Sequence, residues 1–272
     1  MVLPAYVGAL DGKERRETAL ITGASSGIGL DLARLMAANF DLAISARNQG
    51  ELEKIAQELE SKHGNHVHAI AADLARPDAP QQIFSEIERR GLTVGILINN
   101  AGFGAYQPFA ESNLQKDLEM IQVNIAALTS LTKLALPGML ERKRGKIMNV
   151  ASTAGFQPGP MMAVYYATKA YVIMFSEAIA NELKGSGITV TCLCPGATRT
   201  NFAKRADMEN SRLFKLGAMR SIDVARAGYE GMMRGKTIVV PGLLNKLLAQ
   251  SIRFSPRKLV TAVSRSVQER VE

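Results

Sequence analysis

Short apolar or β-branched runs alternate with amphipathic stretches along most of the chain. The runs predict strands at residues 18–22, 41–45, 66–71, 95–99, 145–151, 188–194 and 237–240. Between them, apolar residues recur at helical spacing, which predicts helices at about 28–39, 51–62, 79–90, 112–140, 161–184 and 222–234. Such alternation is typical of βαβ units, whose right-handed crossovers place helices on both faces of a parallel sheet. The pattern therefore predicts an α/β fold, a single doubly wound Rossmann-type domain with a seven-stranded parallel sheet.

Two segments fall outside this alternation. Residues 201–220 are polar with scattered large apolar side chains, and we expect them to form a loop after the sixth strand. In residues 243–272, apolar residues recur at helical spacing under a basic face, which predicts a C-terminal amphipathic helical extension. We therefore divide the chain into a main domain, 1–242, and an extension, 243–272. A lid or a subunit contact is the favoured role for the extension, with attachment to a membrane surface as the alternative.

The formal net charge of +8 is concentrated near the C-terminus, where residues 234–272 hold eight Lys or Arg against two Glu. A solvated helix face is the favoured explanation, and a polyanionic cofactor, an acidic carrier protein or an anionic membrane remain alternatives. No zinc-finger spacing or pattern of stacking aromatic residues accompanies the charge, so nucleic acid is not a predicted partner.

Cysteine content and the N-terminal residues bear on the compartment. Cys192 and Cys194 are spaced to share one face of a strand, so we expect reduced, structural thiols. The first ten residues lack the basic region of a secretory signal, and no uninterrupted apolar stretch reaches membrane-spanning length. These features predict a cytoplasmic protein. The histidines at 63, 66 and 68 lack acidic or thiol neighbours, so we expect exposed strand histidines and no metal.

A glycine-rich turn follows the first predicted strand, where Thr22 to Gly29 read TGASSGIG and lead into a helix. Glycine there allows the backbone to approach a pyrophosphate, and the helix N-terminus supplies free N–H groups and a positive dipole end. A packing turn that needs small residues is the alternative. The second strand ends at Ser45-Ala46-Arg47 without the carboxylate that would bind a ribose 2′-hydroxyl. Because Arg47 could instead pair with a 2′-phosphate, NADP(H) is predicted over NAD(H).

Tyr165 and Lys169 are four residues apart in a predicted helix and therefore lie on the same face. An ammonium group beside a phenol stabilises the phenolate and lowers its pKa towards the range useful for proton exchange with an alcohol. By itself this spacing is common in helices and usually marks a surface pair.

Together these motifs resemble the short-chain dehydrogenase/reductase family over about residues 16–242. The matching features are the Thr22–Gly29 turn, Asp73, Asn99-Asn100-Ala101-Gly102, Asn124, Ser152, Tyr165, Lys169, Pro195-Gly196 and Thr200. Within the family, the chain resembles NADP(H)-preferring members such as bacterial 3-oxoacyl and 17β-hydroxysteroid reductases. Those members often carry a basic residue before the second glycine of the turn, where this chain has Ser26, so the cofactor preference depends on Arg47.

The resemblance implies a catalytic tetrad of Asn124, Ser152, Tyr165 and Lys169. Tyr165 would exchange a proton with the substrate oxygen, and Ser152 would hydrogen-bond that oxygen, which makes both residues substrate-binding. Lys169 would hold the nicotinamide ribose and lower the Tyr165 pKa, while Asn124 would fix a water that links Lys169 to solvent. The implied cofactor-binding residues are Gly23, Ser25, Ser26, Ile28, Gly29, Arg47, Asp73, Leu74, Asn100, Tyr165, Lys169, Thr198 and Thr200.

The expected function is that of an NADP(H)-dependent oxidoreductase interconverting a ketone or aldehyde and an alcohol. The 201–220 loop, with Phe103, Phe156, Met161 and Met162, is expected to select a hydrophobic substrate such as a 3-oxoacyl thioester, a steroid-like ketone or a lipid aldehyde. Two alternatives remain: a nucleotide-sensing binding protein without catalysis, and an epimerase with a tightly held cofactor. The resemblance also implies a homodimer or homotetramer.

Overall fold

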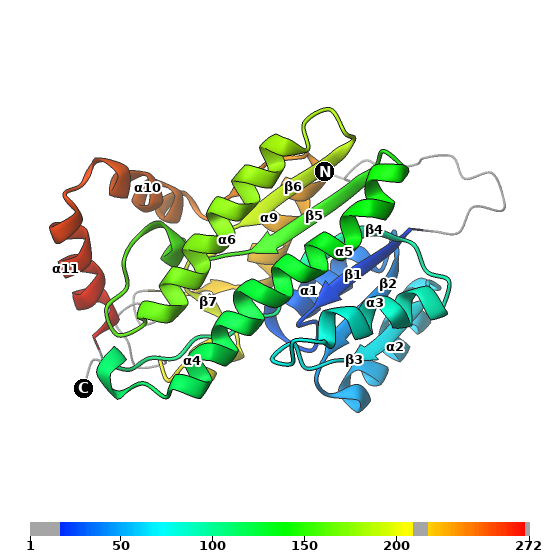
Figure 1. Cartoon of the computed structure of the whole chain (residues 1–272), viewed down its shortest axis with the longest axis horizontal. Coiled ribbons are helices and arrows are strands. Elements are labelled where there is room, and N and C mark those ends of the chain that lie inside the picture. Colours follow the sequence, from blue (N-terminus) through cyan, green and yellow to red (C-terminus); the bar gives the residue numbers. More distant parts are fainter. Residues whose placement is uncertain (1–16, 209–216, 270–272) are drawn as a thin grey trace.

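A seven-stranded parallel sheet forms the centre of the protein in the computed structural model, which describes residues 17–208 and 217–269 (Figure 1). Its strand order is β3-β2-β1-β4-β5-β6-β9. The strands are β1 (Thr18–Thr22), β2 (Asp41–Ala46), β3 (Val67–Ala71), β4 (Val94–Asn99), β5 (Gly145–Val150), β6 (Ile188–Leu193) and β9 (Ile238–Val239). The order reverses beside β1, as in doubly wound folds, which confirms the predicted fold. A separate short sheet, absent from the predicted elements, pairs β7 (Thr198–Arg199) with β8 (Met219–Arg220).

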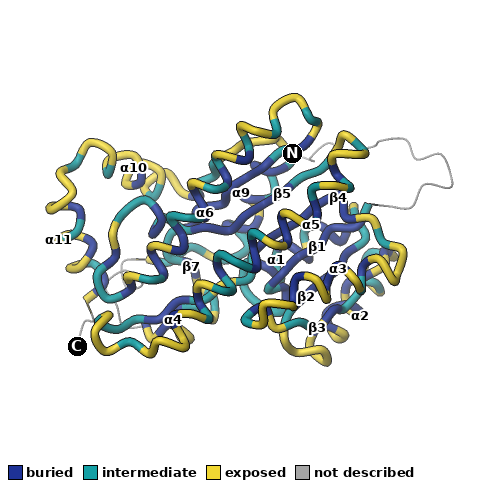
Figure 2. Tube along the Cα trace, viewed as in Figure 1, coloured by how far each residue is buried: buried dark blue, intermediate teal, exposed yellow. Residues whose placement is uncertain are grey.

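The two faces of the sheet are covered by different helices because successive side chains along a strand point to opposite faces. In β1, Ala19 and Ile21 join one buried apolar cluster and Leu20 joins the other. The first cluster includes side chains of α1 (Gly27–Met36), α2 (Gln49–His63) and α9 (Ser221–Met233). The second includes side chains of α3 (Ala79–Arg89), α5 (Leu128–Glu141) and α6 (Ala163–Glu182). Figure 2 shows the buried strands between these exposed helical layers.

The helix predicted at 112–140 is one continuous helical segment with a change of winding. It consists of α4 (Leu114–Ile121), a π-helical turn η2 (Gln122–Ala127) and α5. By length and composition alone the stretch Leu114–Glu141 could cross a membrane, with a mean hydropathy of 1.3, although no apolar run of that length was expected. In this fold, its inner residues Leu131, Thr132 and Met139 are no more than 1% exposed, which accounts for part of the apolar composition, while Leu114 and Leu118 of the same segment are exposed.

The side chains of Cys192 and Cys194 are both buried, and their Sγ atoms lie 3.7 Å apart without a disulfide. They therefore share one face of β6 and its extension, as predicted. The expectation of exposed strand histidines is only partly right. His66 is exposed and precedes β3, whereas His68 is half-buried and its pKa is lowered by burial and by Arg90. Among residues 17–208 and 217–269, no three side chains of metal-ligating type gather.

The C-terminal extension is two helices rather than one. Helix α10 (Leu243–Ser251) ends in a 3₁₀ turn, η4 (Ile252–Phe254), and α11 (Arg257–Gln268) starts after Pro256. A proline interrupts a helix at this point because it has no backbone N–H to donate to the preceding turn. Both helices lie at one end of the molecule, beyond α6 (Figure 1). The 201–220 segment begins with α7 (Asn201–Arg205), and its residues 209–216 lie outside the described ranges. The division of the chain at residue 242 stays a prediction.

Candidate active site

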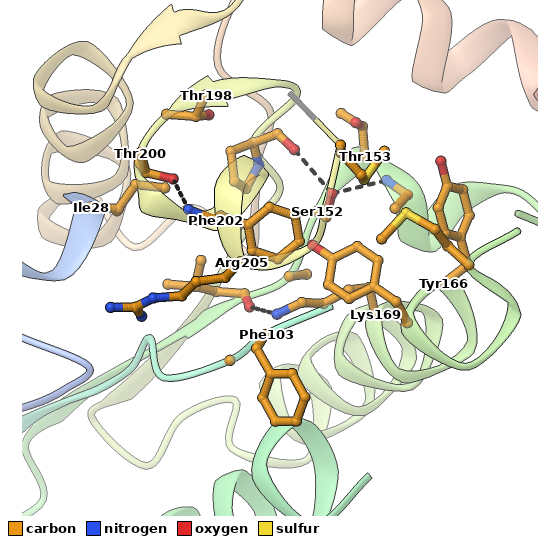
Figure 3. A pocket seen from close by; sticks show the side chains of 18 of the residues that line it. Ile28, Phe103, Ser152, Thr153, Tyr166, Lys169, Thr198, Thr200, Phe202 and Arg205 are labelled. Carbon is orange, nitrogen blue, oxygen red and sulfur yellow. Dashed lines mark hydrogen bonds between the residues drawn. The ribbon is translucent and has the colours of Figure 1, made fainter. Parts of the chain in front are cut away.

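A cavity of about 1320 Å³ opens at the carboxyl ends of the parallel strands. Its lining begins at the turn after β1, continues through the loops after β2 to β6, and ends on α10 and α11. Ligands of open α/β sheets bind in the crevice outside the carboxyl ends of the strands, at the reversal of strand order. The cavity therefore lies where proteins of this fold bind their ligands. Figure 3 shows a close view of it.

The turn between β1 and α1 is shaped to hold an anion. Gly23 and Gly27 adopt positive φ angles of 66° and 56°, where a side chain would be strained. A Cβ on Gly29 would lie 2.3 Å from the carbonyl oxygen of Gly23. The Ser26 side chain makes no capping hydrogen bond, so the first N–H groups of α1 keep their capacity to bind a phosphate. Asn100 fixes the turn by donating from Nδ2 to the carbonyl oxygens of Thr22, at 2.9 Å, and Gly23, at 3.1 Å.

Most of the residues predicted to bind the cofactor line one connected surface of this cavity. They are Gly23, Ser25, Ser26, Ile28, Arg47, Asp73, Leu74, Asn100, Tyr165, Lys169, Thr198 and Thr200. The exception is Gly29, which is buried and lies behind the turn, where it allows close packing. A glycine cradle joined to a long groove fits a nicotinamide dinucleotide, whose pyrophosphate would lie at Gly23 and Ser26.

Two of these groove residues have side-chain hydrogen bonds to nearby backbone, and a third has an exposed side chain. The Asp73 carboxylate accepts a hydrogen bond from the Ala75 N–H at 3.1 Å, which closes a turn after β3. The Thr200 hydroxyl caps α7 by accepting from the N–H of Phe202 at 3.2 Å. Arg47 is exposed at the end of β2, and within the described residues its guanidinium takes part in no ion pair. Its guanidinium therefore has free donors for an anionic ligand.

Tyr165 and Ser152 meet at the substrate end of the cavity. Ser152 follows β5, where its Oγ accepts from the N–H of Ala154 at 3.1 Å and donates to the carbonyl oxygen of Pro195 at 3.3 Å. Tyr165, on α6, is 8% exposed, and its phenol lies near enough to the Ser152 hydroxyl for that hydroxyl to lower the pKa of the phenol. The two hydroxyls predicted to contact one substrate oxygen are thus adjacent. Figure 3 shows Ser152 on the cavity wall with its two hydrogen bonds.

Lys169 lies close to Tyr165, but its ammonium is directed elsewhere. Its Nζ donates to the carbonyl oxygen of Val150 at 2.8 Å and lies 5.8 Å from the centre of the Tyr165 ring. Burial lowers the pKa of Lys169 to about 8. Burial also raises the pKa of Tyr165 above its ordinary value, and the nearby Ser152 hydroxyl opposes this change in pKa. The expectation that Lys169 brings the Tyr165 pKa down is therefore wrong for this state of the protein, because loss of hydration outweighs every lowering contribution.

Asn124 is buried in the π-helical turn and does not line the cavity. Its Oδ1 accepts from the N–H of Phe103 at 3.1 Å, and its Nδ2 donates to the carbonyl oxygen of Phe103 and to Oγ1 of Thr168, both at 3.0 Å. These bonds fix the loop after β4 against α6. The water link proposed for Asn124 stays a prediction.

The wall near Tyr165 is apolar. Phe103 and Met162 line the cavity, and Phe202 of α7 packs on Tyr165 with 5.2 Å between ring centres. Figure 3 labels Phe103 and Phe202 in this wall. Two residues expected here lie elsewhere. Phe156 packs against a buried cluster that includes Ala151 and Cys192. Met161, at a φ of 70°, lines a smaller neighbouring pocket together with Met162 and Tyr165.

The sequence did not indicate how closely α11 approaches the catalytic helix. The Tyr166 hydroxyl lies near the polar side chains of Gln157 and of Ser264 on α11, which lower its pKa, but burial outweighs them and raises the pKa to about 12. Gln268 donates from Nε2 to Oγ of Ser264 at 3.1 Å, and these two residues are at most 3% exposed. The sequence feature that could have indicated this contact is the polar pair Ser264 and Gln268, spaced i, i+4 on the apolar face of α11.

A dinucleotide cradle connected to a buried tyrosine, serine and lysine defines the class: a nicotinamide-dependent oxidoreductase of the Rossmann type. Residues 17–211 match the family model described as short chain dehydrogenase, and the chain belongs to this family. It is therefore an enzyme that interconverts carbonyl and alcohol groups.

Curated relatives and solved structures agree with this assignment. The chain is 30% identical over 276 residues to the very-long-chain 3-oxoacyl-CoA reductase of Rattus norvegicus, covering 98% of this chain and 84% of the relative. It is similar to a Sphingobium yanoikuyae short-chain dehydrogenase in complex with NADPH, with 33% identity, a TM-score of 0.77, and coverage of 89% and 97%. It is also similar to a Comamonas testosteroni alcohol dehydrogenase specific for bulky-bulky ketones, with 30% identity, a TM-score of 0.75, and coverage of 90% and 96%.

Proposed function

We propose that this protein is an NADP(H)-dependent reductase of 3-oxoacyl thioesters with long apolar chains. The observation that carries the proposal is that Tyr165, Ser152 and Lys169 line the same cavity as the glycine cradle and the apolar wall. The name of the rat relative supports a 3-oxoacyl substrate, and the name of the Comamonas enzyme supports a site with room on both sides of a ketone.

In this proposal the chain positions and protonates the substrate oxygen. The nicotinamide dinucleotide, when bound, supplies or accepts the hydride. The Tyr165 hydroxyl donates its proton to the carbonyl oxygen during reduction, and a raised pKa keeps it protonated and ready to donate at neutral pH. The Ser152 hydroxyl hydrogen-bonds the same oxygen as negative charge develops. The Lys169 ammonium holds a cofactor ribose hydroxyl and adds positive charge beside the phenol.

The preference for NADP(H) depends on Arg47. Its exposed guanidinium lines the cavity at the end of β2, where a carboxylate would repel a 2′-phosphate. The solved complex of the Sphingobium relative with NADPH supports the preference. Glu51 also lines this region, in the first turn of α2, where its backbone N–H donates to Oδ1 of Asn48 at 3.1 Å.

The apolar chain of the substrate would occupy the far part of the cavity. Met162 and Phe202 form one side, and Leu248, Val260 and Val263 of the extension form the other. Burial of a long alkyl chain against these residues contributes about 0.8 kcal/mol per methylene. This arrangement supports the lid as the role of the C-terminal helices.

The test is the oxidation of NADPH, with NADH in parallel, across 3-oxoacyl thioesters of increasing chain length, short ketones and steroid ketones. We expect kcat/KM to rise with chain length and to favour NADPH. Equal kcat/KM for short and long chains would remove the substrate assignment. No oxidation of either nucleotide with any carbonyl would remove the catalytic function and leave nucleotide sensing. Release of an epimerised product without net NADPH oxidation would instead indicate an epimerase.

Assembly and location are further proposals. Exposed apolar side chains on α4, including Leu114 at 71% and Leu118 at 51%, support a homo-oligomer formed through this helix. Light scattering of the wild type and of Leu118→Glu tests it, because a charge in the contact would dissociate the copies. The free, buried thiols of Cys192 and Cys194 support a reducing, cytoplasmic location, which fractionation of cells producing the protein would test.

A further inference from the structure

Large apolar side chains gather on the outside of the C-terminal helices. Seven of the thirteen large hydrophobic residues exposed in the described part of the chain belong to α10, η4 and α11, with exposed fractions from 53% to 88%. They are Leu243, Leu244, Leu247, Leu248, Phe254, Leu259 and Val263. An apolar surface of this density is rare on a protein that contacts only water. Figure 2 shows the exposed stretches along both helices.

Exposed basic residues lie on the same helices as these apolar side chains. Five cations between residues 243 and 269 are exposed, and Glu269 is the only acidic residue in that range. The cations are Lys246, Arg253, Arg257, Lys258 and Arg265. Two copies of the chain that met through this surface would bring like charges together, which is unfavourable. A negatively charged surface complements both the charge and the apolar side chains.

The apolar surface continues into the cavity. Leu248, Leu259 and Val263 are more than half exposed, and they also line the cavity that holds Tyr165. Val260, on the inner side of α11, is buried and lines the same cavity. An alkyl chain can therefore pass between the outside of α10 and α11 and the catalytic residues while it stays in contact with apolar groups.

We propose that α10, η4 and α11 form a docking surface for an anionic phospholipid bilayer. The outer leucines and Phe254 enter the boundary between headgroups and acyl chains, and the five cations contact the headgroups. The inner side of the helices covers the cavity, so a lid and a membrane contact are compatible roles. The further step, in which an apolar-chain substrate enters the cavity directly from the bilayer, rests on the proposed function.

The experiment is flotation of the full chain with vesicles of phosphatidylcholine alone or mixed with phosphatidylglycerol. One variant, Leu244→Gln/Leu247→Gln/Phe254→Gln, removes exposed apolar groups that do not line the cavity. A second variant, Arg253→Gln/Arg257→Gln/Lys258→Gln, removes three cations. The matched control, Leu140→Gln/Met174→Gln, removes exposed apolar groups on α5 and α6 instead, and neither residue lines the cavity.

We expect the wild type and the control to bind the anionic vesicles. This binding should weaken as the salt concentration rises. The charge variant should partition about a hundredfold less, at about fivefold per cation. The partitioning of the apolar variant onto the vesicles should fall at least tenfold, because its glutamine side chains gain no free energy from entering the apolar boundary. Reduction of a short, water-soluble ketone should be unchanged in all four proteins, which shows that the fold and the catalytic residues are intact.

Absence of vesicle binding by the wild type, or equal binding by all four proteins, would overturn the docking surface. A wild-type dimer that dissociates in the apolar variant, without vesicle binding, would overturn it in favour of a contact between copies. Vesicle binding without any ketone reduction would leave the docking surface in place and remove the proposed function, so the two failures are distinguishable.

Discussion

The Nζ atom of Lys169 lies 5.8 Å from the centre of the Tyr165 ring, and both side chains are less than 10% exposed. Burial acts on the two groups in opposite directions, because it disfavours the charged form of each: the pKa of Lys169 falls to about 8 and the pKa of Tyr165 rises. Near neutral pH the phenol is therefore protonated, as a proton donor must be, and Lys169 carries its charge at an energetic cost.

This cost predicts a pH-dependent stability. The ordinary lysine pKa of 10.5 applies to the unfolded chain, and the folded value is about 8. Below pH 8 the ammonium is charged in both states and its burial is fully unfavourable. Between pH 8 and 10.5 the unfolded state binds more protons, so the free energy of unfolding rises with pH, by up to about 3 kcal/mol from this group.

Lys169→Met removes this contribution. The difference in unfolding free energy between wild type and variant should change by up to about 3 kcal/mol between pH 7.5 and 10.5, in favour of the wild type at high pH. Urea denaturation at several pH values measures it. Lys133→Met, on the exposed side of α5, is the control and should keep a constant difference. A constant difference for Lys169→Met as well would contradict the burial effect.

Removal of the phenolic hydroxyl should abolish turnover. Tyr165→Phe loses the proposed proton donor, so kcat should fall by about 10²-fold to 10⁴-fold, while the Kd of NADPH stays within about threefold. Steady-state kinetics and nucleotide fluorescence measure the two quantities. Tyr171→Phe is the control, because Tyr171 is on the same helix, bonds Thr129 at 3.0 Å and lies outside the cavity lining. Full activity of Tyr165→Phe would refute the assigned proton donor.

The fold could be predicted from sequence because each strand of the sheet is a short apolar run bounded by turns. Predicted and observed strands agree within two residues at each end, as for Val67–Ala71 against 66–71. The π-helical turn at Gln122–Ala127 could not be predicted, since apolar periodicity alone does not distinguish it from a regular helix. The pair β7 and β8 was missed because two-residue strands carry no pattern.

The positions of the site residues could be predicted where motif spacing fixes them. Properties that depend on burial in the folded chain, such as pKa values, could not be predicted. The spacing of Tyr165 and Lys169 places them side by side, but it contains no information on loss of hydration, which sets the direction of both pKa changes. The contact of Tyr166 with Ser264 joins residues almost a hundred positions apart. Only the folded chain shows that α11 closes one side of the cavity.

Cofactor choice should change with Arg47. In Arg47→Gln the Kd of NADPH should rise by about 10-fold to 100-fold, because hydrogen bonds between a cation and a phosphate are lost, while the Kd of NADH should stay the same. Fluorescence titration with both nucleotides measures the ratio. Arg34→Gln is the control, since Arg34 is exposed on α1, pairs with Glu58 at 3.1 Å and does not line the cavity. An unchanged ratio of the two Kd values in Arg47→Gln would show that other residues of the groove set the preference for NADPH.

Two glycines should respond oppositely to alanine. At Gly29 a methyl group would meet the Gly23 carbonyl oxygen at 2.3 Å, so Gly29→Ala should cost about 1–3 kcal/mol of stability and weaken nucleotide binding. At Gly50, near the start of α2, the nearest atom is 3.7 Å away. Gly50→Ala should therefore stabilise the protein by about 0.4–1 kcal/mol. Thermal denaturation with and without NADPH measures both, and equal melting temperatures for the two variants would contradict the packing argument.

The approach of the Ser264 hydroxyl to the Tyr166 hydroxyl should govern how α11 covers the substrate. If α11 is a lid, Tyr166→Phe and Ser264→Ala should each raise KM for a long-chain substrate by about 2-fold to 10-fold, with kcat within about twofold, because binding weakens while Tyr165 is unchanged. The double variant should show little further change, since both single variants remove the same polar contact. Thr261→Ala, on α11 but outside the cavity lining, is the control. Strictly additive effects on KM would show that the two residues act independently, and α11 would then be a fixed part of the wall.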